Sequence, residues 1–248
     1  NVWCAAGKGT FGTDEIVRQV KRMELEKIVD HRKIVVPQLG APGVSAHEVK
    51  KQTGFSVIYG PVRASDLPDF LEKNMKATPK MREVKFTFLD RLVLVPAEIS
   101  IGLPYLLPVM LGFFFLSGLS RSGYSFDLAL KHGLGAALNV VLMFFAGILV
   151  APALLPWLPG KSFSVKGIFS GIIVFVLSFH HKFISGSIIE VIAWFLLYIG
   201  ASSFLSMNFT GSSTYTSLSG VKKEMKVAVP LQIAAVVAGA ILWLISRF

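Results

Sequence analysis

The strongest constraint on the fold is the scarcity of charge in the second part of the chain. Residues 99–248 hold 9 Lys and Arg and 3 Asp and Glu, whereas residues 1–98 hold 16 and 12. Five apolar runs in this part reach the roughly 17–25 residues that a helix needs to cross a bilayer. We therefore expect residues 99–248 to form an all-α membrane domain, with spans at about residues 99–119, 134–155, 165–183, 188–207 and 227–245.

The composition of the whole chain excludes an ordinary soluble protein. Charged residues make up 16% of the 248 residues, whereas a soluble domain carries about 25%. The net charge of +10 comes largely from basic residues that flank the apolar runs, which is the distribution that membrane topology predicts. The basic residues do not form a cluster with interleaved aromatic residues, so a nucleic-acid partner is not expected.

Basic residues are more frequent on one side of the predicted spans. The richer side carries Lys80, Arg82, Lys85, Arg91, Lys161, Lys166, Lys222, Lys223 and Lys226. The other side carries Arg121, Lys131, Lys182 and Arg247. By the positive-inside rule, residues 1–98 lie on the cytoplasmic side of the cytoplasmic (inner) membrane.

Four polar features of the membrane domain are candidates for function. Glu190, near the start of the fourth span, is either an interfacial residue or an ion or proton site. His180 and His181 face different sides of a helix, so a solvated helix end is favoured over a metal site. Asn139 is predicted to make a hydrogen bond between helices. The segment 208–225, rich in Ser, Thr and Gly, is either a connector or the surface of a site.

The first 98 residues alternate predicted strands and helices, which is typical of a parallel sheet with helices on its faces. Strands are expected at residues 2–4, 33–37 and 55–59, and helices at 13–29, 45–53 and 65–73. A basic linker begins at about residue 77. Because ligands bind beyond the carboxyl ends of such strands, Cys4, the Gly40–Gly43 turn and the Tyr59–Val62 turn together predict the rim of a cofactor site.

The single cysteine, Cys4, excludes a disulfide framework and a Cys-rich metal site within this chain. Gly7-Lys8-Gly9-Thr10 is not a phosphate-binding loop, because that motif needs Ser or Thr directly after the Gly-Lys pair. His31 and His47 do not stand in a context that would make Cys4 a catalytic nucleophile. The residue pattern alone leaves open that Cys4 is a buried and inert side chain.

The opening segment Asn1-Val-Trp-Cys-Ala-Ala-Gly-Lys-Gly-Thr-Phe11 resembles the cap-helix motif of the corrinoid proteins of mercury methylation. The similarity continues through Val35-Val-Pro-Gln-Leu-Gly-Ala-Pro-Gly43, Tyr59-Gly-Pro-Val-Arg63 and Ala77-Thr-Pro-Lys-Met81. A five-span tail is also the pattern of that family, so the resemblance covers essentially the whole chain. It implies a Rossmann-like α/β domain that binds a corrinoid, as in the corrinoid iron–sulfur protein of the acetyl-CoA pathway. Because the chain begins inside the motif, we expect the N-terminal portion of that domain to precede it.

The resemblance implies that the thiolate of Cys4 is the lower axial ligand of the corrinoid cobalt. A soft, anionic thiolate donates more electron density than imidazole, which favours transfer of a methyl group with its electrons to Hg(II). Asn1, Trp3 and Lys8 would shape the pocket beneath the corrin ring, and a helix that begins just after Cys4 would lower the pKa of its thiol. The expected cofactor-binding residues are Asn1, Val2, Trp3, Cys4, Ala5, Ala6, Gly7, Lys8, Gly40 and Gly43.

The resemblance also implies partners. Because the one thiol would bind cobalt, we expect Hg(II) to arrive on a small thiol or on a cysteine-rich protein. The family implies such a protein, a ferredoxin with two iron–sulfur clusters that returns the cobalt to its reduced state. A methyl-donor protein of one-carbon metabolism would supply the methyl group, and membrane lipid would surround the tail.

Two other functions are open. The chain could be a membrane-anchored corrinoid methyl carrier of one-carbon metabolism for which Hg(II) is incidental. It could instead be a membrane transporter or scaffold without enzymatic activity, in which case it binds no corrinoid.

Overall fold

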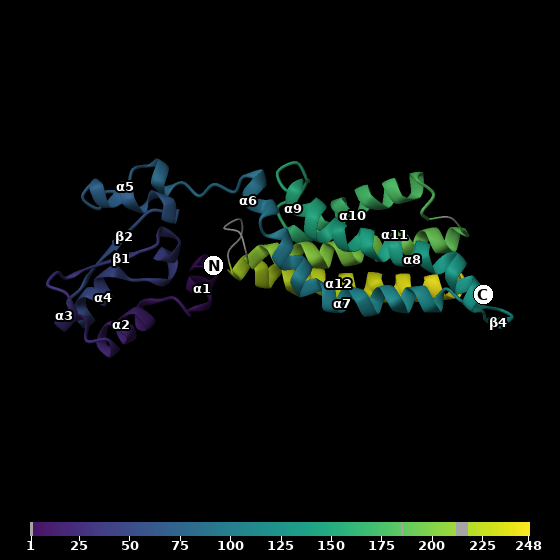
Figure 1. Cartoon of the computed structure of the whole chain (residues 1–248), viewed down its shortest axis with the longest axis horizontal. Coiled ribbons are helices and arrows are strands. Elements are labelled where there is room, and N and C mark those ends of the chain that lie inside the picture. Colours follow the sequence, from purple (N-terminus) through teal and green to yellow (C-terminus); the bar gives the residue numbers. More distant parts are fainter. Residues whose placement is uncertain (1, 185, 212–217) are drawn as a thin grey trace. The chain divides into compact units, whose positions relative to one another are not determined.

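The computed structural model describes residues 2–184, 186–211 and 218–248. The chain divides into two compact units (Figure 1). Unit 1 comprises Asn1–Lys85 with Gly211–Leu218, and unit 2 comprises Phe86–Thr210 with Ser219–Phe248. Each unit has its own hydrophobic core.

Unit 1 contains two parallel strands, β1 (Lys33–Val36) and β2 (Ser56–Tyr59), which pair from Lys33 opposite Ser56 to Val36 opposite Tyr59. The connection between them includes a 3-10 turn, η1 (Gln38–Gly43), and helix α4 (Ala46–Thr53). Unit 1 also contains helices α2 (Thr13–Arg22), α3 (Leu25–Ile28) and α5 (Leu67–Glu72), with the short turns η2 (Ala64–Asp66) and η3 (Lys80–Arg82). The sequence predicted both of these strands and their neighbouring helices α4 and α5, with bounds that differ by one or two residues.

The predicted strand at residues 2–4 is wrong, because this segment belongs to helix α1 (Val2–Lys8). Val2 and Trp3 have strand propensity, but Ala5 and Ala6 favour a helix, and Ala6 is buried in unit 1. Among the described residues the parallel sheet of unit 1 has only two strands, which is smaller than the sheet expected of a Rossmann-like domain.

The predicted helix over residues 13–29 is interrupted. Helix α2 ends at Arg22, and Glu24 adopts a left-handed conformation with φ 45° before α3 begins. Gly12, rather than Thr13, is the N-cap residue, and the Thr13 hydroxyl instead bonds a neighbouring segment. Local propensity predicted the two helical stretches but not the break between them.

The electrostatics of α2 give a pH prediction. Arg18 donates two hydrogen bonds of 2.9 Å to Glu15, and this contact, with a further bond from Gln19, holds the pKa of Glu15 below its usual 4.5. Because the folded-state pKa is depressed, the stabilisation is present above pH 4.5 and is lost as the pH falls through the folded-state pKa. NMR titration of the Glu15 carboxyl should show a lowered pKa that rises in Arg18→Ala, and an unchanged pKa in that variant would contradict the assignment.

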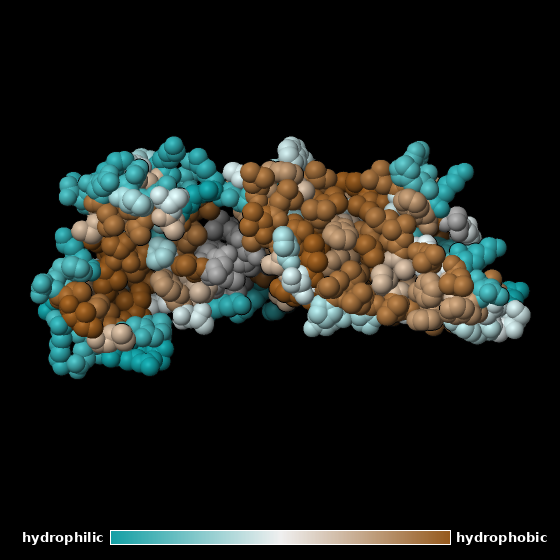
Figure 2. Space-filling view, in the orientation of Figure 1, coloured by the Kyte–Doolittle hydropathy of each residue, from teal (hydrophilic) through white to brown (hydrophobic). Residues whose placement is uncertain are grey.

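Unit 2 is a bundle of long apolar helices. Five described helices are long and apolar enough to cross a membrane, which indicates a multi-pass membrane protein. Figure 2 shows a mostly hydrophobic surface over these helices. They are α7 (Val95–Leu116), α8 (Phe126–Phe145), α10 (Phe163–His180), α11 (Ile188–Ser206) and α12 (Leu218–Ile245). Short elements join them: α6 (Phe88–Leu92), the hairpin β3 (Leu119–Ser120) and β4 (Gly123–Tyr124), the π-helical η4 (Ala146–Val150), α9 (Ala151–Ala153) and η5 (Met207–Gly211).

The number of spans agrees with the prediction, but several helices begin earlier than their apolar runs. Helix α8 begins at Phe126 rather than near residue 134, and α12 begins at Leu218 rather than near residue 227. The extra turns carry Asp127, Lys131 and three lysines of α12, which remain helical although they are polar. The hydropathy pattern predicts where a helix becomes apolar, not where it begins.

Helices α10 and α11 pack closely because small residues face one another. The Ser202 hydroxyl donates to the Gly167 carbonyl at 2.8 Å, and the Ser203 hydroxyl donates to the Ser164 carbonyl at 2.9 Å. A Cβ on Gly171 would meet the Ser202 hydroxyl and lie 2.7 Å from the Tyr198 carbonyl oxygen. Small residues and interhelical hydrogen bonds are the usual basis of helix association in membranes.

Candidate functional site

The carboxyl ends of β1 and β2 lead into turns that are bonded to each other. The Gln38 amide, after β1, donates to the Pro61 carbonyl, after β2, at 3.5 Å. The Val62 amide donates to the carbonyl of Met81 at 2.9 Å, and Arg82 Nη1 donates to Gln38 Oε1 at 3.2 Å. Three of the four segments that carry the family resemblance therefore meet at this edge of the sheet.

The fourth of these segments, α1, packs against η1. Ala6 is 6% exposed, and a Cβ on Gly43 would lie 3.1 Å from its carbonyl oxygen and 2.5 Å from that of Phe11. A Cβ on Gly40 would collide with the Phe11 ring. Because Gly40 and Gly43 have no side chain, α1 and the residues after it can lie directly on η1. A larger residue at either position would collide with them.

The end of α1 explains the Gly-rich sequence that follows Cys4. Gly9 has φ 79°, and its amide donates to the Ala6 carbonyl at 3.2 Å. The Thr10 amide donates to the Ala5 carbonyl at 3.0 Å. This pair of bonds, with a glycine in the left-handed region, is the Schellman arrangement that ends a helix. Gly9 and Thr10 therefore terminate a helix, in keeping with the rejection of a phosphate-binding loop.

The structure brings the predicted site residues to α1 and η1. Val2 and Ala5 are half-buried, Ala6 and Gly40 are buried, Gly43 is half-buried, and Gly7 and Lys8 are exposed. Trp3 and Cys4 belong to α1, but their side chains, like the whole of Asn1, lie outside the described part of the chain. Cys4 therefore lies within the first turns of a helix and not before its start. The contacts of these residues with a cofactor stay a prediction.

Two hydroxyl groups, of Thr13 and Tyr59, hold the residues that follow η1 in place through contacts that the sequence analysis did not predict. Thr13 Oγ1 accepts a hydrogen bond from the Ser45 amide at 2.8 Å. The Tyr59 hydroxyl donates to the Val44 carbonyl at 2.7 Å. Their partners, Ser45 and Val44, lie 32 and 15 residues away in the sequence. A sequence pattern carries no signal for such contacts.

Replacement of Gly43 should release α1 from the turn. In Gly43→Val the new side chain would meet the backbone of both Phe11 and Ala6, which cannot move without displacing the helix. We expect unit 1 to lose about 1–3 kcal/mol of stability, the usual cost of overpacking, and protease cleavage near residues 8–12 to increase. In the control Gly7→Val, nothing lies within 4 Å of the added Cβ. Equal protease sensitivity in both variants would contradict this packing role.

The residues of α1 fit a corrinoid in two respects. A cysteine thiolate is a soft donor suited to a transition metal such as cobalt. A Cβ added at Gly7, near the end of α1, or at Gly9, just after it, would meet no described atom within 4 Å, which leaves room beside these two glycines for a ligand. Within the described part of the chain no three His, Cys, Asp or Glu side chains gather as a metal site.

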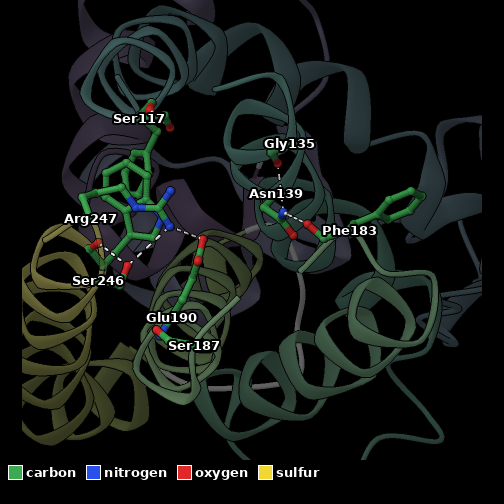
Figure 3. A network of polar contacts seen from close by, with 10 residues as sticks. Ser117, Gly135, Asn139, Phe183, Ser187, Glu190, Ser246 and Arg247 are labelled. Carbon is green, nitrogen blue, oxygen red and sulfur yellow. Dashed lines mark hydrogen bonds and ion pairs between the residues drawn. The ribbon is translucent and has the colours of Figure 1, made fainter. Parts of the chain in front are cut away.

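In unit 2, Asn139 lies in a buried polar network (Figure 3). Its Nδ2 donates to the carbonyls of Gly135 and Phe183, each at 2.9 Å, and its Oδ1 accepts from the Tyr198 hydroxyl at 2.9 Å. The Tyr198 hydroxyl also lies 3.0 Å from the Ser178 hydroxyl. The predicted hydrogen bond between helices is confirmed, since it links α8 to α11.

Glu190 forms an ion pair with Arg247, which links the start of α11 to the second residue beyond the end of α12 (Figure 3). Both side chains are mostly buried, with 17% and 10% exposed. Arg247 also lies over the Trp243 ring, 5.1 Å from its centre. Of the two functions considered for Glu190, this contact favours a structural one at a helix end.

Loss of the Glu190 charge should therefore destabilise unit 2. Glu190→Gln leaves the guanidinium of Arg247 without its carboxylate, at an expected cost of about 1.5–3 kcal/mol. Thermal unfolding in detergent measures this cost. The double variant Glu190→Gln/Arg247→Met should recover part of the loss, because the uncompensated charge is removed. A single variant that unfolds at the wild-type temperature would rule out a stabilising ion pair.

The two remaining polar candidates of unit 2 are the His180–His181 pair and the segment 208–225. His180 and His181 contact each other edge to face, with ring centres 5.3 Å apart. Asn208, at the start of the Ser- and Thr-rich segment, donates to Glu98 at 3.3 Å. Residues 212–217 of that segment lie outside the described residues, so the two interpretations of it stay open.

Lys166, which the sequence analysis counts among the basic residues beside the predicted spans, is buried. It belongs to α10, it is 5% exposed, and its ammonium donates to the carbonyls of Leu155 at 2.7 Å and Leu158 at 2.6 Å. Both carbonyls lie in the connection between α9 and α10, so the ammonium group holds this connection against the start of α10. Lys166 therefore contributes to packing and not only to the charge of a loop.

Comparison with known proteins finds no matching family model, no similar curated protein and no similar solved structure.

Proposed function

We propose that this protein transfers a methyl group from a corrinoid to inorganic Hg(II), giving methylmercury. The observation that supports the proposal is the meeting of the motif segments at one edge of unit 1. Segments far apart in the sequence, from α1 to Met81, contact one another there. The family resemblance rests on these same segments, and a cap helix is what it implies for the segment that forms α1.

The residues at this edge of unit 1 would bind the cobalt, contact the corrin ring and position α1. When bound, the corrinoid would supply a cobalt-held methyl group that leaves toward an electrophile. Cys4 would hold the cobalt through its thiolate and donate electron density to it. Val2, Trp3, Ala5 and the open backbone at Gly7 would lie against the ring. Packing on η1 fixes the position of α1 and so that of the ligand.

The proposal extends to the surroundings of the site. Strands β1 and β2 would be part of a Rossmann-like cofactor domain, and unit 1 would lie on the cytoplasmic side of the inner membrane. The one cysteine of the chain would be committed to cobalt, so delivery of Hg(II) and of electrons falls to partners. A cysteine-rich ferredoxin with two clusters and a methyl-donor protein of one-carbon metabolism have the required chemistry.

A methylation assay that supplies Hg(II) and a folate-linked methyl donor separately tests the proposal. We expect methylmercury only when both are present together with a reductant. Methyl exchange with the one-carbon donor at a rate that Hg(II) does not change, without methylmercury, would favour the methyl carrier. Neither product, in a protein that contains no corrinoid, would favour the transporter or scaffold.

A further inference from the structure

A groove of about 580 Å³ runs between α10, α11 and α12. Its walls are apolar and include Val165 and Ile168 of α10, Ile199 of α11, and Leu231 and Ala235 of α12. Leu231 is 65% exposed and Val165 is 37% exposed. Since these helices are long enough to cross a membrane, apolar side chains that line an open groove would face lipid hydrocarbon.

The groove is basic at the end where α10 and α12 begin. Lys161 and Lys223 both line it and are exposed, and neither makes an ion pair with any residue in the described part of the chain. Glu224 lines the same end, but its Oε1 accepts the Ser164 amide at 2.7 Å, at the start of α10. The Glu224 carboxylate therefore accepts a hydrogen bond from the N-terminus of α10. The ammonium groups of Lys161 and Lys223 can then bind an external anion.

The length of the groove matches one leaflet of a bilayer. Along α12, the rise from Lys223 to Ala235 is about 18 Å at 1.5 Å per residue. The hydrocarbon of one leaflet is about 15 Å deep, half of the bilayer core. A phospholipid whose phosphate lies beside the lysines would thus have an acyl chain of the right length for the apolar part.

A second cavity of unit 2 provides a contrast. It has a volume of about 530 Å³ and is lined by α7, α8, α11 and α12. The charged residue that lines it is Glu98, which accepts a hydrogen bond from Asn208 at 3.3 Å. Glu98 would repel a phosphate, whereas the groove has two lysines against the single carboxylate of Glu224. Of these two cavities, the groove beside Lys161 and Lys223 therefore has the charge suited to an anionic headgroup.

We propose that the groove between α10, α11 and α12 binds an anionic glycerophospholipid. Its phosphate would lie between Lys161 and Lys223, and one acyl chain would run along Val165 and Leu231 toward Ala235. Basic residues at the membrane surface attract anionic lipids, and the apolar walls add the burial of a chain. This site is independent of the proposed corrinoid chemistry.

Native mass spectrometry of the purified protein tests the proposal. The protein in detergent is mixed with equal amounts of phosphatidylglycerol and phosphatidylcholine of identical acyl chains. We expect wild-type protein to retain phosphatidylglycerol preferentially. In Lys161→Gln/Lys223→Gln the ratio of bound phosphatidylglycerol to phosphatidylcholine should fall about 30-fold, from the loss of two lysines. The matched control Lys131→Gln/Lys182→Gln removes two exposed lysines from the opposite end of the bundle and should keep the ratio.

Two further arms separate the lipid from other occupants. Leu231→Trp, at an exposed position, should reduce retention of both lipids by filling the groove. Inorganic phosphate at millimolar concentration should not displace phosphatidylglycerol, because the acyl chain contributes to binding; displacement would show that the lysines bind phosphate alone. Equal retention of both lipids by wild-type protein, or the same loss in the control, would overturn the proposal. A third outcome would also overturn the proposal: the protein forms a dimer that binds no phospholipid, and Leu231→Trp dissociates this dimer. The groove would then bind a second copy of the chain.

Discussion

Cys4→Ala is expected to abolish methylmercury formation. Cys4 is the one thiol of the chain, so no neighbouring cysteine can replace it as the cobalt ligand. Alanine is the best helix former, and the substitution should leave α1 folded on η1. The loss would therefore report the ligand and not the fold. The measurement is methylmercury production by purified protein supplied with reductant, methyl donor and Hg(II), together with circular dichroism to confirm folding.

Cys4→His distinguishes the electronic role of the thiolate from simple ligation. Imidazole also binds cobalt, but it is neutral and donates less electron density, so transfer of a methyl group with its electrons should slow markedly while the corrinoid stays bound. Full activity in Cys4→Ala would remove the ligand role of Cys4. Full activity in Cys4→His would retain ligation but contradict the need for an anionic donor.

Gly167→Leu is expected to separate α10 from α11 and to have the largest effect on the fold of unit 2. A Cβ on Gly167 would meet the Ser206 hydroxyl and would lie 2.6 Å from Ser203 Cα and 2.7 Å from the Ser202 carbonyl oxygen. Two of these three contacts are to backbone atoms, which a rotamer change cannot relieve. We expect a loss of about 3 kcal/mol or more, at the upper end for overpacking, and weakening of the bond from Ser202 to Gly167.

The matched control for this substitution is Gly112→Leu. Gly112 also lies in a long apolar helix, α7, but nothing lies within 4 Å of its added Cβ. Both variants gain the same apolar side chain, so insertion into the membrane should be equally favourable. Thermal unfolding in detergent should show a large loss for Gly167→Leu and little change for Gly112→Leu. Equal melting temperatures would mean that the close contact of α10 and α11 does not stabilise the bundle.

In unit 2, the sequence predicted the membrane-spanning helices but not the side-chain contacts between them. Five spans follow directly from long apolar runs, because a bilayer requires their length and composition. The buried position of Lys166 did not follow, since its partners, the carbonyls of Leu155 and Leu158, reach its ammonium group only through the fold of the connection between α9 and α10. The ion pair of Glu190 with Arg247 joins the start of α11 to the chain just beyond the end of α12. No local sequence pattern predicts a pairing between residues so far apart.

In unit 1, the strands β1 and β2 were predictable because each is a short β-branched run bounded by turn residues. The segment 2–4 misled because strand propensity is a weak and context-dependent signal. Its neighbours decide the outcome: Ala5 and Ala6 continue a helix, and Gly9 ends it. The turn glycines were correctly placed near the motif, but their packing under Phe11 became visible only in three dimensions.

The absorption spectrum of the purified protein tests the assignment of Cys4 most directly. We predict corrin bands in the visible region whose positions differ from those of the free corrinoid, because a thiolate donates to the cobalt. In Cys4→Ala these bands should either revert to the positions of the free corrinoid or disappear with the cofactor. A wild-type protein without corrin bands, or bands that are identical in wild type and Cys4→Ala, would contradict the proposal that Cys4 binds the cobalt of a corrinoid.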